Sequence, residues 1–135
     1  LAPKGALTVR YPKSSAIYAL AVGVMMVAMW SFFILSGQVP ELEERPVEIL
    51  LHLTAELATA AVLVTAGAAS LGRRRWGLVL QLFGFGMLTY TVIVSPGYYA
   101  AQGQTAFAAM FAVLLVATLV FLVVAARSLL RGAGA

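Results

Sequence analysis

The only histidine of the chain, His52, lies four positions before Glu56, in a stretch that is otherwise almost entirely apolar. Four residues make about one turn of an α-helix, so the imidazole and the carboxylate would share one face of a helix. Such a pair can hold a proton, a cation or a small polar ligand, or it can hydrogen-bond and join helices. It offers only two ligands to a metal, whereas a closed zinc site takes about four. We therefore predict no cofactor, with a metal at His52 and Glu56 or a haem at His52 as the remaining alternative.

The composition indicates that the helix carrying this pair lies in lipid. The sequence has 135 residues, of which 62% are hydrophobic and 10% are charged, whereas soluble domains average about 25% charged residues. A soluble domain of this size cannot bury so much apolar surface, because chains of about 150 residues hide only about two-thirds of the surface that they expose when unfolded. The sequence thus predicts the lipid bilayer as the main partner of the protein.

Four apolar runs have the length of membrane-spanning helices, which need about 20 residues to cross about 30 Å of hydrocarbon. Backbone groups in lipid must be hydrogen-bonded within their own segment, so these runs should be helical. We predict an all-α, polytopic integral membrane protein with an up-down four-helix bundle in residues 16–126, flanked by segments 1–15 and 127–135. The first run is expected to span the membrane, because its apolar core is too long for a signal peptide. The predicted helices cover approximately 16–36, 46–71, 77–95 and 105–126, the third ending before Pro96 and Gly97.

Charged residues are divided between the two sides of this arrangement. Basic residues precede the first helix, follow the fourth, and form the run Arg73, Arg74 and Arg75 between the second and third. Four glutamates lie in the first loop, on the other side. The positive-inside rule therefore predicts a plasma (inner) membrane protein with both termini in the cytoplasm. We expect the three arginines to act as topology anchors near anionic lipid headgroups rather than to bind nucleic acid.

Polar residues of the second predicted helix, from His52 to Ser70, lie mostly on one stripe, which should face the other helices or a wet cavity. Matching depths along antiparallel helices brings residues of the first and third helices to the level of this stripe. Tyr90 and Thr91 point about 100° apart, and Gln81 shares the stripe of Thr91, so the sequence leaves open which side of the third helix faces inward. The candidate ligand- or proton-binding residues are His52, Glu56, Tyr90, Trp30, Thr59 and Thr91.

The best functional hypothesis from the sequence is a protein that binds or transports a small ligand, a proton or a cation. Its polar site would lie at His52 and Glu56 and open to the outside. The alternative is a non-catalytic accessory or scaffold subunit that packs on other membrane proteins. No catalytic set is present, since the chain contains no aspartate for a Ser-His-Asp triad and no cysteine, so we do not expect an enzyme. Helices rich in small residues favour a homo-oligomer or a larger membrane complex.

Overall fold

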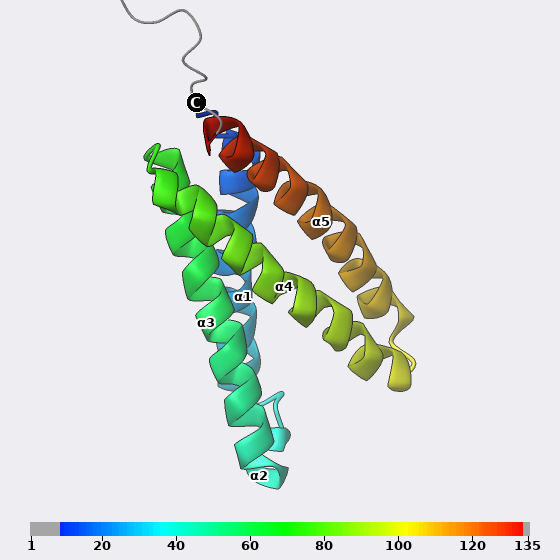
Figure 1. Ribbon diagram of the computed structural model, residues 1–135. Helices are drawn as coiled ribbons and strands as arrows, with labels where there is room; N and C mark the ends of the chain where they lie inside the picture. The colour runs from blue at the N-terminus through cyan, green and yellow to red at the C-terminus, as the bar shows by residue number, and fades with distance from the viewer. Residues whose placement is uncertain (1–8, 134–135) are drawn as a thin grey trace, which may run out of the picture.

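The computed structural model describes residues 9–133, and its regular elements are all α-helices (Figure 1). Four of them are long and apolar enough to cross a membrane, as the sequence predicts. Residues 1–8 and 134–135 lie outside the described part of the chain, and with them Lys4 and half of the predicted segment 1–15. The elements are α1 (Lys13–Leu35), α2 (Glu41–Glu44), α3 (Pro46–Leu71), α4 (Arg75–Ala101) and α5 (Thr105–Ala133).

The sequence predicts that the third long apolar helix ends before Pro96, but the structure differs. Instead α4 continues through this proline to Ala101. Proline lacks a backbone N–H and so removes one helical hydrogen bond, but spanning helices tolerate this loss when their surroundings compensate for it. The chain turns only after Gln102, where Gly103 takes a φ of 72°, a left-handed conformation that glycine adopts without steric cost. The fourth spanning helix is also longer than expected, and the first loop contains the short helix α2.

Helices α1 and α3 approach each other closely because glycines lie at their contact. A Cβ atom on Gly67 would lie 2.7 Å from the backbone oxygen of Ala16, and one on Gly23 would lie 2.9 Å from that of Ala60. Neither position has room for a side chain unless a backbone moves. Helices in lipid gain little from hiding apolar surface, so close backbone contact through small residues is a main source of their association. The pair of α1 and α3 is therefore a rigid unit.

The helices form two pairs that meet at one end and diverge toward the other (Figure 1). One pair is α1 with α3, and the other is α4 with α5. We call the closed end, with the start of α1, the Arg73–Arg75 turn and the end of α5, the basic end. We call the open end, with α2 and the turn between α4 and α5, the acidic end. The halves of the molecule next to them are the basic half and the acidic half.

In the basic half, polar side chains hold the two pairs together. The hydroxyl of Tyr18 on α1 lies 2.8 Å from that of Thr118 on α5, and the Tyr18 ring stacks on Phe121 with centroids 4.5 Å apart. The hydroxyl of Ser15 lies 2.9 Å from the side-chain oxygen of Gln81 on α4, and both residues are fully buried. Gln81 thus lies on the inward-facing side of α4, which answers the question that the sequence leaves open.

Candidate functional site

The diverging helix pairs enclose a cleft of about 810 Å³ in the acidic half. Ligand pockets in proteins typically measure about 300–1,000 Å³, so the cleft has the volume of a binding site for a small organic molecule. All four long helices and α2 contribute side chains to its wall. The lining is mainly apolar and includes four methionines, which adapt readily to different ligand shapes. These are Met25, Met26, Met29 and Met110.

Both members of the histidine–glutamate pair line this cleft. The side chain of Glu56 is 6% exposed, which is a low value for a group that can carry a charge. The two side chains do not hydrogen-bond to each other, and within residues 9–133 neither forms a hydrogen bond or an ion pair with another side chain. A buried carboxylate without a partner costs free energy, so its presence at the wall of a cleft favours a role in holding a ligand.

Trp30 of α1 supplies a second polar group that lacks a partner. Its indole ring packs edge-on against His52, with ring centroids 5.7 Å apart, and it too lines the cleft. The indole Nε1 is buried and donates no hydrogen bond. Ser70 Oγ and Gln81 Nε2 also lack partners, but neither residue lines the cleft. Trp30 and Glu56 thus both line the cleft and carry polar groups without a partner, although the Trp30 N–H itself is buried.

The structure separates the other sequence candidates. Thr91 lines the cleft with His52 and Glu56. Thr59 is buried next to this site, but its hydroxyl donates to the backbone oxygen of Ala55 in its own helix, at 2.8 Å. Tyr90 is 71% exposed on the outer face of α4 and does not line the cleft. The physical reason is that α4 turns its Gln81 side inward, which points Tyr90 toward the surroundings.

The anchor residues Arg73, Arg74 and Arg75 lie in and beside the turn between α3 and α4, at the basic end. All three are exposed and none lines the cleft. Arg73 has a φ of 57°, which allows the tight connection between the two helices. Their position fits contact with lipid headgroups, but it leaves them outside the candidate site.

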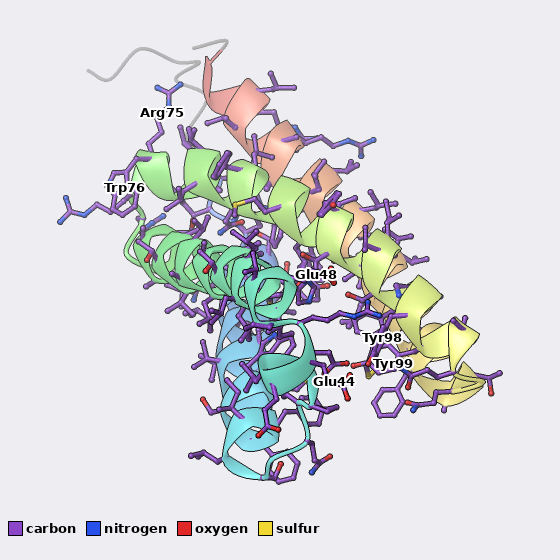
Figure 2. The ribbon with its side chains drawn as sticks, turned by 90° about the horizontal axis from the view of Figure 1, so that it is seen from below. Glu44, Glu48, Arg75, Trp76, Tyr98 and Tyr99 are labelled. Atoms are coloured by element: carbon purple, nitrogen blue, oxygen red, sulfur yellow. The ribbon has the colours of Figure 1, made fainter. Side chains whose placement is uncertain are left out.

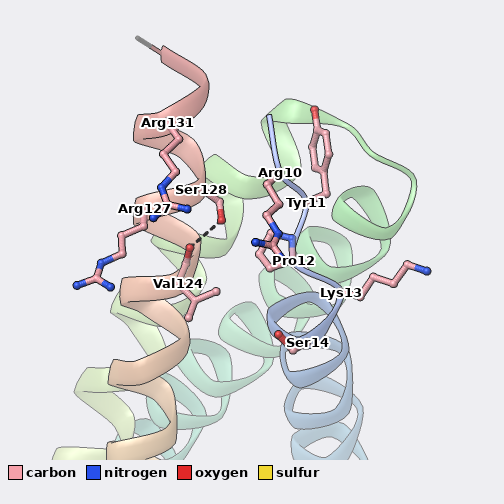
Figure 3. Close-up of a pocket in the computed structure, with 9 residues that line it drawn as sticks. All are labelled: Arg10, Tyr11, Pro12, Lys13, Ser14, Val124, Arg127, Ser128 and Arg131. Carbon is pink, nitrogen blue, oxygen red and sulfur yellow. Dashed lines mark hydrogen bonds between the residues drawn. The ribbon is translucent and has the colours of Figure 1, made fainter. Parts of the chain in front are cut away.

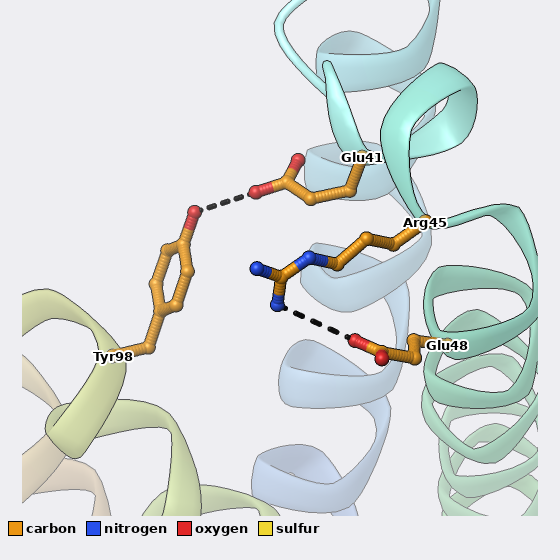
Figure 4. A network of polar contacts seen from close by, with 4 residues as sticks. All are labelled: Glu41, Arg45, Glu48 and Tyr98. Atoms are coloured by element: carbon orange, nitrogen blue, oxygen red, sulfur yellow. Dashed lines mark hydrogen bonds and ion pairs between the residues drawn. The ribbon is translucent and has the colours of Figure 1, made fainter.

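A hydrogen bond between α4 and the short helix α2 bridges the open end of the cleft (Figure 4). The hydroxyl of Tyr98 on α4 donates to Oε1 of Glu41 on α2, at 2.7 Å. This bond, together with the backbone N–H of Glu41 itself, holds the pKa of the Glu41 carboxyl below its ordinary value. Beside it, Arg45 lies 3.6 Å from a carboxylate oxygen of Glu48, and both of these side chains are mostly exposed. The mouth of the cleft is therefore spanned by a hydrogen bond between α2 and α4.

Negative charge and aromatic rings dominate the polar part of the cleft. Four of the five carboxylates of the chain line it, namely those of Glu41, Glu44, Glu48 and Glu56, against one guanidinium, that of Arg45. Viewed from the acidic end, Glu44 and Glu48 lie on one side of the opening, and Tyr98 and Tyr99 lie on the other (Figure 2). The aromatic residues of the lining are Trp30, Phe33, Tyr98, Tyr99, Phe107 and Phe111.

Four of the candidate residues predicted from the sequence line the cleft, namely His52, Glu56, Trp30 and Thr91, whereas the residues of its mouth are not among those candidates. From the sequence, Glu41, Glu44 and Glu48 are interpreted as a solvated loop and Tyr98 and Tyr99 as part of a connecting segment. The extension of α4 past Pro96 is what carries the two tyrosines to α2, and no pattern in the sequence indicates that the proline would be tolerated. Within the described residues, no group of three or more histidine, aspartate or glutamate side chains is arranged to hold a metal ion.

Comparison with known proteins places the chain in one family. Residues 9–132 match the model of a family described as "Domain of unknown function (DUF8058)". Because the match covers nearly the whole sequence, the chain belongs to this family. No curated protein and no solved structure shows significant similarity to it.

Proposed function

We propose that the protein binds a small organic cation in the cleft of its acidic half, with Glu56 as the counter-ion. The observation that carries the proposal is Glu56, a residue that is 6% exposed, lines the cleft and has no hydrogen-bond or ion-pair partner among the described residues. A ligand with a positive charge would supply that partner. The proposal extends the hypothesis of a polar site at His52 and Glu56 by naming the chemistry of its ligand.

The rest of the lining supports a cation with an apolar body. Aromatic faces attract cations within about 6 Å of their centroids, by about 0.5–2 kcal/mol per contact. Methionine and phenylalanine side chains would pack against apolar groups of the ligand. The excess of carboxylates at the mouth would raise the local concentration of cations over that of anions.

In a membrane, the proposed orientation follows from the two ends of the molecule. The basic end would lie in the cytoplasm under the positive-inside rule, and the acidic end would then face outward. The cleft would open to the outside, because the contacts of Tyr18 and Ser15 close the basic half. A transporter would need a second state in which these contacts separate, and we propose binding as the primary function.

Fluorescence of Trp30 can report on occupancy of the cleft. The chain has two tryptophans, and the substitution Trp76→Phe at the basic end leaves Trp30 as the only one. Purified protein in detergent would be titrated with tetraphenylphosphonium, and with tetraphenylborate as an anion of the same shape. We expect a saturable change with the cation and none with the anion. Equal responses to both ions would contradict the proposal, since apolar partitioning alone would then account for them.

The charge of Glu56 is tested by a matched pair of substitutions. Glu56→Gln removes the carboxylate from the cleft, whereas Glu43→Gln removes one from an exposed position of α2 that does not line it. We expect Glu56→Gln to weaken tetraphenylphosphonium binding by at least about tenfold, equivalent to about 1.4 kcal/mol. Glu43→Gln should leave binding within about twofold. If the wild-type protein gives no saturable response, the accessory-subunit alternative, with a partner helix seated in the cleft, replaces the proposal.

A further inference from the structure

A second, smaller pocket lies at the basic end, between the start of α1 and the end of α5 (Figure 3). Its volume is about 480 Å³, and it is separate from the cleft, with which it shares no lining residue. Four cationic side chains surround it, together with the hydroxyl-bearing Tyr11, Ser14 and Ser128. The cationic residues are Arg10, Lys13, Arg127 and Arg131.

No side-chain carboxylate of this protein can neutralise these four charges. All five acidic residues lie between positions 41 and 56, on α2 and the first half of α3, near the opposite end of the molecule. Like charges gathered around one hollow repel each other, so the arrangement favours a bound anion. In Figure 3 the Arg10 guanidinium lies toward the space between the two helices and the Arg131 side chain lies over α5 near Ser128, whereas Lys13 and Arg127 extend away from this space.

The backbone at the pocket favours an anion as well. The pocket includes Pro12, Lys13 and Ser14, which form the N-terminal end of α1. This end has no acidic residue in its first turn and no side-chain cap. The first backbone N–H groups of a helix lack partners within it, and the helix dipole is positive there. A phosphate group can use both features together with planar arginine side chains, which bind its oxygens in pairs.

We propose that this basic pocket binds one phosphate group, held between Arg10 and Arg131. The pocket lies where one helix that is long and apolar enough to cross a membrane begins and another ends, which in a membrane would be the depth of lipid headgroups. The phosphate can come from an anionic lipid headgroup or from free phosphate. Basic pockets between spanning helices are typical sites for anionic lipids. The inference does not depend on the function of the cleft.

The test measures thermal unfolding of the full chain in detergent during titration with dioctanoyl phosphatidylglycerol. Parallel titrations use dioctanoyl phosphatidylcholine, which has no net charge, and sodium phosphate against sodium chloride at equal ionic strength. The double variant Arg10→Gln/Arg131→Gln should need about 30-fold more anionic lipid for half-maximal stabilisation, since each basic residue contributes roughly fivefold. The matched variant Arg74→Gln/Arg75→Gln removes the same charge at the same end, outside the pocket, and should change this value by less than about twofold.

Each outcome either supports or overturns the proposed phosphate site. Saturation by phosphatidylglycerol alone assigns a lipid headgroup, and saturation by sodium phosphate with the same loss in Arg10→Gln/Arg131→Gln assigns free phosphate. Equal weakening in both double variants overturns the proposal, because the attraction is then a diffuse property of the basic end. The absence of saturable stabilisation by either compound also overturns it. If the glutamine variant does not fold, Arg10→Lys/Arg131→Lys against Arg74→Lys/Arg75→Lys gives the same comparison, with a smaller loss expected at the pocket.

Discussion

In the basic half of the molecule, the hydroxyl of Tyr18 lies 2.8 Å from that of Thr118, and the hydroxyl of Ser15 lies 2.9 Å from the side-chain oxygen of Gln81. Ser70 Oγ and Gln81 Nε2 in this half are buried without partners, but neither residue lines the cleft. In the acidic half, Glu56 and the indole N–H of Trp30 lie at the wall of a cleft without partners. Polar groups that join helices in lipid satisfy one another. Polar groups that remain unpaired beside a cavity cost stability, and a ligand can supply the missing contacts. This difference supports our proposal that the acidic half binds a ligand, whereas contacts in the basic half hold the two helix pairs together.

The largest effect should come from the glycine contact between α1 and α3. Gly67→Ala would place a Cβ atom 2.7 Å from the backbone oxygen of Ala16, and we expect it to lower the free energy of unfolding by about 2–3 kcal/mol. Gly86→Ala is the matched control, because a Cβ atom there meets nothing within 4 Å. Equilibrium unfolding in mixed detergent would measure both. Equal losses would show that α1 and α3 do not form the rigid unit described above.

In the acidic half, a substitution of Glu56 should increase the stability of the protein. Glu56→Gln removes an ionisable group without a partner from the mainly apolar wall of the cleft, so we expect the free energy of unfolding of the unliganded protein to rise by about 1 kcal/mol. Glu43→Gln, at an exposed position of α2, should change it little. The same unfolding assay measures both variants. A loss of stability in Glu56→Gln would mean that this carboxylate holds the helices together, and the distinction between the two halves would fail.

In the basic half, we expect a substitution of Tyr18 to lower the free energy of unfolding, by less than Glu56→Gln raises it. Tyr18→Phe removes the contact with Thr118 but keeps the ring that stacks on Phe121. We expect the unfolding free energy to fall by about 0.6 kcal/mol, the average for hydrogen bonds between helices in membranes. Tyr90→Phe removes a hydroxyl from the exposed face of α4 and serves as the control. If Tyr18→Phe is as stable as the wild-type protein, the hydrogen bond between Tyr18 and Thr118 does not help to hold the basic half together.

The smallest effect concerns the link across the mouth of the cleft. The Tyr98 hydroxyl holds the pKa of Glu41 below its ordinary value, so Tyr98→Phe should raise that pKa, whereas Tyr90→Phe should not. Because the folded pKa is the lower one, the link contributes to stability at neutral pH, and the contribution is lost as pH falls through the Glu41 pKa. Carbon NMR of the labelled Glu41 carboxyl during a pH titration measures the shift. Identical titration curves in wild type and Tyr98→Phe would show that the two residues do not interact in solution.

Much of the fold follows from the sequence, because a long apolar run in lipid has few alternatives to a helix. Depth matching along antiparallel helices also places Trp30 at about the level of Glu56, and in the structure its ring lies 5.7 Å from that of His52, one helical turn away from Glu56. The sequence could not predict which side of α4 faces the other helices, because polar residues occur on both of its sides and Tyr90 is stable at a membrane interface. The continuation of α4 past Pro96 depends on tolerance for one missing hydrogen bond, which local sequence does not reveal.

The divergence of the two helix pairs is also invisible in the sequence. Hydrophobic pattern predicts that four helices associate, but the angle between them depends on which small residues meet. Gly23 and Gly67 bring α1 and α3 together along their length, whereas Tyr18 and Thr118 join α1 to α5 nearer the closed end. The cleft therefore exists because of where these few contacts lie. Its volume and the residues of its mouth could be determined only from the three-dimensional structure.

The most direct test of binding in the acidic half is an infrared difference spectrum of the protein with and without tetraphenylphosphonium. Ligation of Glu56 by the cation should change the stretching bands of its carboxyl group. We expect this change in the wild-type protein and in Glu43→Gln, and we expect it to be absent in Glu56→Gln. A difference spectrum that is the same in all three proteins would contradict the assignment of Glu56 as the counter-ion.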